Sequence, residues 1–193
     1  MDREWLFISE RLNDVSRICG REHPIYEHVG NFGLALYVMG FFKCRDIMMV
    51  EDVDDVEAGT ILKEHFVPVE KEKIPTNYNI LKFKEKYLLV IGDPVFPTHF
   101  AVLINQHSPQ PFFSKLKIYG AGYDSLSELE SEFIGWEGIG PEDFHYYRMK
   151  SSVEPRTRSL TEEYIDQKIG ERLIEDYTAP KRERKRVIEW VGK

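Results

Sequence analysis

The chain has 193 residues, of which 42% are hydrophobic and 31% are charged. This length and composition predict one folded core and exclude a disordered chain. No apolar run approaches the ~20 residues that a membrane span needs, and the charged start at residues 1–4 predicts no secretory signal. Two cysteines exclude a disulfide scaffold. We therefore expect a soluble, cytoplasmic protein with no membrane partner.

The charge is acidic overall and unevenly distributed. The chain has 26 Lys and Arg residues and 33 Asp and Glu residues, which gives a formal net charge of −7. A negative surface repels phosphate backbones, so a nucleic-acid partner is not expected. Residues 148–193 carry 12 basic and 9 acidic side chains, whereas residues 1–147 carry 14 and 24. An acidic body with a mildly basic C-terminal region can associate with itself or with an acidic partner.

The first third of the chain predicts helices and one segment of undecided type. Residues 2–19 predict an amphipathic helix, because apolar side chains recur at steps of three and four. Its buried face would hold Trp5, Ile8, Leu12, Val15 and Cys19. The apolar run 33–42 fits a buried strand or a buried helix equally well. Residues 47–50 predict a strand, and Asp54 predicts the start of a helix that ends near residue 65.

Residues 67–149 predict a mostly antiparallel sheet, packed against the helices at 2–19, 54–65 and 125–135, so the fold class is α+β. A hairpin is expected from segments 80–83 and 87–91. The expected strands lie at 67–69, 80–83, 87–91, 100–104, 116–119 and 144–149.

Gly120-Ala121-Gly122 predicts a tight turn from a strand into the helix at 125–135, with Asp124 or Ser125 as its cap. The free N–H groups and the dipole of a helix N-terminus can hold a phosphate. Gly120, Gly122 and Ser125 are therefore the candidate residues for a phosphate-bearing cofactor of the acyl-CoA or nucleotide type. The alternative is a turn that glycine simply makes easy.

The C-terminal region predicts a linker followed by a helical hairpin. Residues 150–158 are polar and contain Pro155, and a capping box at Ser159 starts a helix that ends near residue 176. A second helix begins at Pro180 with the basic run Lys181–Arg186, which would pair with the acidic residues of the preceding helix. The expected organisation is a single core domain at 1–149, a linker at 150–158 and a helical extension at 159–193.

Cys44 and His99 are the candidate catalytic residues. A thiolate nucleophile needs a histidine partner in space, and Lys43 and Arg45 would lower the pKa of the Cys44 thiol. The alternative assigns both side chains to packing. No metal site is predicted, because His99 and His107 would lie ~26 Å apart along one strand.

No established catalytic motif is present. The leading hypothesis is therefore a non-enzymatic binding or interaction protein, homo-oligomeric through residues 159–193. A cofactor-binding or transferase-type domain that uses Gly120–Ser125 is the first alternative. A Cys–His hydrolase that uses Cys44 and His99 is the second.

Overall fold

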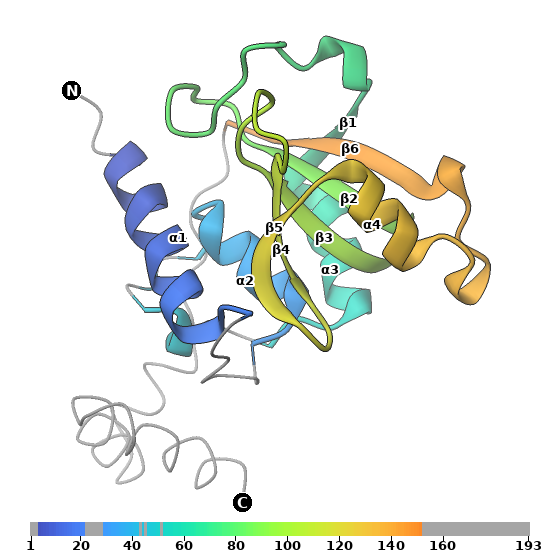
Figure 1. Ribbon diagram of the computed structural model, residues 1–193, viewed down its shortest axis with the longest axis horizontal. Helices are drawn as coiled ribbons and strands as arrows, with labels where there is room; N and C mark the ends of the chain where they lie inside the picture. Colours follow the sequence, from blue (N-terminus) through green and yellow to red (C-terminus); the bar gives the residue numbers. More distant parts are fainter. Residues whose placement is uncertain (1–3, 22–28, 43, 45, 51, 152–193) are drawn as a thin grey trace, which may run out of the picture.

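The computed structural model of the chain describes residues 4–21, 29–42, 44, 46–50 and 52–151 (Figure 1). The predicted helical hairpin at 159–193 and most of the predicted linker lie outside the described residues. The α-helices are α1 (Glu4–Cys19), α2 (Asn31–Val38), α3 (Asp55–His65) and α4 (Leu126–Phe133). The strands are β1 (Phe66–Val69), β2 (Tyr87–Asp93), β3 (Phe96–Leu103), β4 (Phe112–Leu116), β5 (Gly120–Asp124) and β6 (Phe144–Met149). Short 3-10 helices are η1 (Ile47–Met49), η2 (Lys71–Lys73), η3 (Trp136–Gly138) and η4 (Pro141–Asp143).

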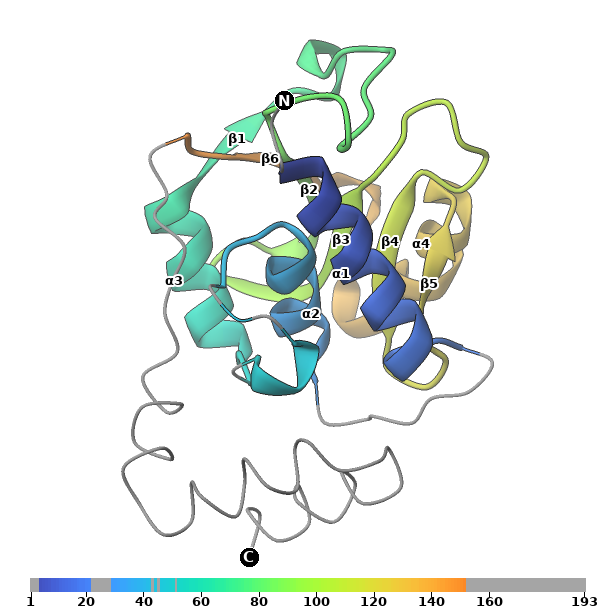
Figure 2. The ribbon, with the colours of Figure 1, turned by 90° about the vertical axis from the view of Figure 1, so that its left-hand side faces the viewer.

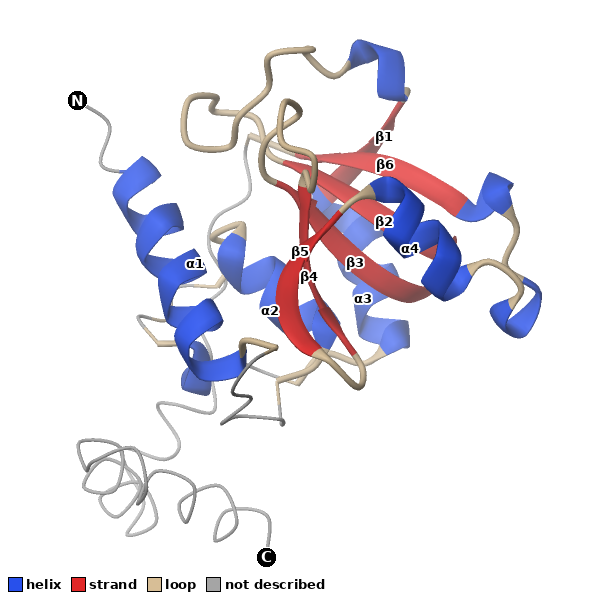
Figure 3. Cartoon of the chain, viewed as in Figure 1, coloured by secondary structure: helices blue, strands red, loops and turns tan. Residues whose placement is uncertain are grey.

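The six strands form one antiparallel sheet in the order β1-β6-β2-β3-β4-β5, which confirms the α+β class (Figure 3). The last strand of the described chain lies inside the sheet, between the first two. Leu88 of β2 therefore lies opposite Val102 of β3 on one side and Tyr147 of β6 on the other. Because β1 reaches the sheet only through β6, the sheet is complete only when residues 144–149 have paired.

Helices cover both faces of the sheet. In Figure 2, α1, α2 and α3 lie in front of the sheet and α4 lies behind it. Phe100 of β3 meets Phe32 of α2 with ring centroids 4.8 Å apart. The neighbouring His99 points to the opposite face, where its ring lies 4.7 Å from that of Phe133 of α4. Alternation along β3 thus assigns these two neighbours to different layers of the protein.

The extent of burial explains why one helix could be predicted from the sequence and another could not. Four predicted face residues of α1 are buried, as expected: Ile8, Leu12, Val15 and Cys19. Residues 32–38 of α2 are all buried, because this helix lies between α1 and the sheet. A helix that is apolar all round has no periodic pattern, which resolves the ambiguity of 33–42. None of the described helices is long and apolar enough to span a membrane.

Two segments predicted as strands have other structures: one forms a 3-10 helix and the other forms a turn. Residues 47–49 form a 3-10 helix, because the Asp46 side chain accepts the N–H of Met48. The predicted strand 80–83 is wrong for a related reason. The Asn79 side chain accepts the N–H of Leu81, and the Asn79 carbonyl accepts the N–H of Phe83. Strand β2 consequently pairs with β3 and β6 rather than with 80–83.

The strand predicted at 116–119 is also displaced. Strand β4 ends at Leu116, residues 117–119 form a turn, and β5 begins at Gly120. Gly120 has φ of +78°, a left-handed conformation that favours glycine at the tip of this hairpin. The helix at 125–135 is confirmed as α4, and Ser125, one of the two caps considered, is its N-cap.

Gly59 of α3 tests the contact between this helix and the β2–β3 turn. Alanine normally stabilises a helix interior by up to ~1 kcal/mol relative to glycine. A Cβ at position 59 would overlap the carbonyl oxygen of Val95 and lie 2.8 Å from its carbonyl carbon. We therefore expect Gly59→Ala to lower the free energy of unfolding by ~1–3 kcal/mol. The exposed neighbour Thr60→Ala is the control and should change it by less than ~0.5 kcal/mol in urea unfolding. A Gly59→Ala variant as stable as the wild type would contradict this contact.

Candidate functional site

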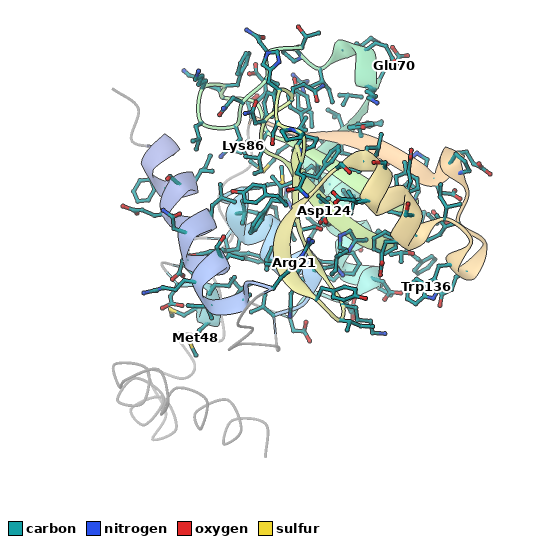
Figure 4. All side chains as sticks on the ribbon, viewed as in Figure 1. Arg21, Met48, Glu70, Lys86, Asp124 and Trp136 are labelled. Carbon is teal, nitrogen blue, oxygen red and sulfur yellow. The ribbon has the colours of Figure 1, made fainter. Side chains whose placement is uncertain are left out.

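A polar cluster occupies the α4 face of the sheet at its β5 edge. Residues 20 and 21 run beside β5, with the Arg21 N–H donating to the Ala121 carbonyl at 3.2 Å. The Arg21 guanidinium then reaches Asp124, where Nη2 lies 2.6 Å from Oδ2 (Figure 4). The Ser114 hydroxyl lies 3.4 Å from the same carboxylate oxygen. This cluster ties the end of α1 to the hairpin of β4 and β5.

Gly122 makes this arrangement possible. A Cβ at position 122 would lie 2.7 Å from Nε of Arg21, so any side chain there would displace the guanidinium. Gly120 and Gly122 were predicted to form a turn that opens a helix, and this prediction is wrong. Both lie in β5, where one shapes the hairpin tip and the other leaves room for Arg21.

The start of α4 already has its own hydrogen-bond partners. The Glu128 N–H donates to the Ser125 hydroxyl at 3.2 Å, and the Ser125 N–H donates to the Glu128 carboxylate at 2.7 Å. The bonds from Ser125 lower the pKa of Glu128 below its ordinary value. A phosphate here would be repelled by the Glu128 carboxylate, whereas the carboxylate of Asp124 is already paired with Arg21.

His99 lies behind this cluster and is 2% exposed. Burial, and to a smaller extent the charge of Arg21, lowers the pKa of His99 to about 3. The imidazole is therefore neutral at physiological pH. Within the described part of the chain, Nε2 of His99 and Nε of Arg21 are the buried side-chain atoms without a hydrogen-bond partner.

Cys44 lies on the other face of the sheet, with α1 and α2. It borders a pocket of about 630 Å³. The pocket is lined by Phe7, Glu10, Arg11, Asp14, Tyr37, Cys44 and Asp46. Arg11 donates to the carbonyls of Tyr37 at 2.8 Å and Phe42 at 3.1 Å, which caps the end of α2. The structure does not bring Cys44 and His99 together, because β3 directs His99 towards α4.

A third region combines exposed apolar side chains with acidic ones. We call Ile118, Tyr119, Ile134 and Trp136 the docking patch; they are 82%, 56%, 42% and 48% exposed. The patch lies where the β4–β5 turn approaches the end of α4, and Lys117 Nζ stands 6.0 Å from the Trp136 ring centroid. Figure 4 shows Trp136 on this outer side of the molecule. Large exposed apolar side chains that lie near one another are typical of interaction surfaces, so this patch is a candidate site.

An acidic groove adjoins the docking patch along α4. Its volume is about 360 Å³, and it is lined by Leu116, Asp124, Ser127, Glu128, Ser131 and Glu132. Residues 124–143 contain seven acidic side chains and no Lys or Arg. Among the described residues, no three His, Cys, Asp or Glu side chains are placed to hold a metal ion. Of the three carboxylates in the groove, that of Asp124 is paired with Arg21, and those of Glu128 and Glu132 belong to exposed residues.

Neither Arg21 nor the docking patch was predicted from the sequence. Arg21 lies two residues after the predicted end of a helix, and nothing local connects it with Asp124, 103 residues later. The docking patch left two signals in the sequence. One is the stretch 124–143, which holds seven acidic residues and no basic one, and the other is Trp136 within a glycine-rich turn.

The buried histidine predicts a pH dependence of stability. The unfolded chain binds a proton on His99 near the ordinary pKa of 6.5, whereas the folded chain does so only near 3. The stabilising contribution of the neutral ring is thus fully present above pH 6.5 and is lost as the pH falls towards 3. The slope approaches ~1.4 kcal/mol per pH unit. His99→Phe keeps a ring against Phe133 but cannot titrate. In urea unfolding between pH 7 and pH 4, we expect wild type to lose stability more steeply than His99→Phe. Parallel curves would contradict this assignment.

Gly122→Ala tests the packing of Arg21 over β5. The methyl group should push the guanidinium from Asp124 and leave a buried carboxylate without its cation, which costs ~1–3 kcal/mol. In an Arg21→Ala background the same substitution has no guanidinium to displace, so the loss in free energy of unfolding should be less than half as large. A double-mutant cycle in urea measures both values. Equal costs in the two backgrounds would show that Gly122 does not serve Arg21.

These assignments rest on the geometry of the chain itself. Comparison with protein-family models, with curated proteins and with solved structures found no match. No relative therefore supplies a function for the Arg21 cluster, the Cys44 pocket or the docking patch.

Proposed function

We propose that this protein is a non-enzymatic binding protein that recognises a partner polypeptide through the docking patch and the acidic groove. The observation that carries the proposal is the exposure of four large apolar side chains beside a groove lined by three carboxylates. The apolar side chains would supply contact area, and the carboxylates would select charge and orientation. The partner would therefore carry lysine or arginine next to aliphatic or aromatic residues.

The charged groups in the interior support binding over catalysis. The Arg21 guanidinium is paired with Asp124, and the Arg11 guanidinium caps α2. Buried His99 is a weak base whose ring packs against Phe133. Each of these groups has a role in holding the fold together. The carboxylate of Glu132, by contrast, borders the groove, and that of Glu128 borders it while accepting the Ser125 N–H.

The other two functional hypotheses have less support. A phosphate-bearing cofactor at Gly120, Gly122 and Ser125 would face the carboxylates of Asp124 and Glu128. A hydrolase that uses Cys44 would need a base other than His99. Homo-oligomerisation through residues 159–193 stays a prediction, and light scattering of the full chain over a range of concentrations tests it.

Peptide binding tests the proposed function. We expect a labelled peptide of alternating arginine and leucine to bind the full chain, with an affinity that falls as salt rises from 50 to 300 mM. Trp136→Ser should weaken binding by about tenfold or more, because an interface anchor is typically worth ~2 kcal/mol or more. Fluorescence anisotropy measures both effects.

Val95→Ser is the matched control, because Val95 is also an exposed apolar residue, 61% accessible, and it lies in the β2–β3 turn. This variant should bind like wild type. A peptide of alternating aspartate and leucine should not bind. The proposal fails if Trp136→Ser binds the arginine peptide as well as wild type does.

A further inference from the structure

The chain contains a segment with the chemistry that the docking patch and the acidic groove would recognise. Residues 181–186 hold five basic side chains and one acidic one. They are followed directly by an apolar group made up of Val187, Ile188, Trp190 and Val191. The segment thus has basic residues next to apolar ones, which is the combination that the proposed partner polypeptide would carry.

We propose that segment 181–191 docks on the docking patch and acidic groove of its own chain, so that an external partner must displace it. The inference rests on the proposed function and names the regulation of that same surface. The cationic side chains of the segment would enter the groove beside the exposed carboxylates of Glu128 and Glu132. Its apolar residues would cover Trp136 and its neighbours.

Charge complementarity favours this occupant. Residues 124–143 contain seven acidic side chains and no Lys or Arg. One of the seven, Asp124, is buried and paired with Arg21, and Lys117 lies beside Trp136. The segment is the densest basic run of the chain. Opposite charges that meet in a partly enclosed groove are screened less by salt than fully exposed pairs are. The apolar contacts add a component that salt does not weaken.

The length of the connection allows docking within one chain. The described structure ends at Ser151, and 29 residues separate it from Lys181. The helix predicted at 159–176 would span ~27 Å, and the other eleven residues of the connection can add up to ~36 Å. This reach covers the distance across a domain of this size, and tethering keeps the effective concentration of the segment near the millimolar range. A docked tail of this kind would outcompete a second copy of the chain at micromolar concentrations.

Hydroxyl-radical footprinting of the full chain tests the inference at Trp136 and Tyr119. The triple variant Arg182→Glu, Arg184→Glu and Arg186→Glu reverses the charge of the segment and leaves the described core unchanged. We expect oxidation of Trp136 and Tyr119 to rise severalfold in this variant. Affinity for the arginine–leucine peptide should also rise several times, because the tail no longer competes.

Two control variants accompany the test. Arginine-to-lysine changes at the same three positions keep the charge, so protection of Trp136 should persist. The triple variant Arg156→Glu, Arg158→Glu and Arg172→Glu makes the same charge change outside the segment and should also leave Trp136 protected. Circular dichroism and the melting temperature check that every variant is folded.

Three outcomes would overturn the inference. The first is equal oxidation of Trp136 in wild type and in the charge-reversal variant. The second is protection that disappears on hundredfold dilution, which would assign the surface to a second copy of the chain. The third is an equal loss of protection in the Arg156, Arg158 and Arg172 variant. Peptide binding that is unchanged by charge reversal would leave the proposed function intact, whereas absence of peptide binding from all variants would remove that function by itself.

Discussion

Side chains of successive residues in the central strands point to opposite faces of the sheet, and this alternation decides which residues can share a site. Strands β2 and β3 are covered on both faces, so every neighbouring pair of side chains is divided between two layers. Phe100 packs on α2 while His99 packs on α4. A histidine and a cysteine that look like partners in the sequence therefore belong to different layers. The same rule gathers Arg21, Ser114, Asp124 and His99 on one face, although they come from distant parts of the chain.

The sequence predicted the elements whose signal is local. Helix α1 has a clear apolar stripe, α3 and α4 have side-chain caps at Asp54 and Ser125, and β6 matches the predicted strand 144–149. Helix α2 could not be assigned, because complete burial removes periodicity. The turn that starts at Asn79 was mistaken for a strand, because apolar residues follow it. Its stabilising hydrogen bonds are accepted by the side chain and the backbone carbonyl of one residue, Asn79.

The candidate sites were predicted less well, because they depend on contacts between distant parts of the chain. Glycines at 120 and 122 suggest a phosphate-binding turn when they are considered by themselves. Arg21, which explains Gly122, lies about a hundred residues earlier and cannot be connected with it from a single sequence. The docking patch combines the β4–β5 turn with the end of α4. Each part resembles an ordinary polar turn until the two are placed side by side.

The division of charge between interior and surface is the basis of the binding proposal. Buried or half-buried cations have assigned partners: Arg21 binds Asp124, Arg11 caps α2, and Lys115 donates to the Val29 carbonyl at 2.6 Å. Acidic side chains, by contrast, collect on α4 and the turns that follow it, next to exposed apolar ones. NMR titration of the full chain with the arginine–leucine peptide tests this account most directly. Chemical-shift changes in residues 116–119 and 124–143, and in the displaced segment 181–191, are the predicted result. Changes centred on the pocket at Cys44 and Tyr37 would contradict it.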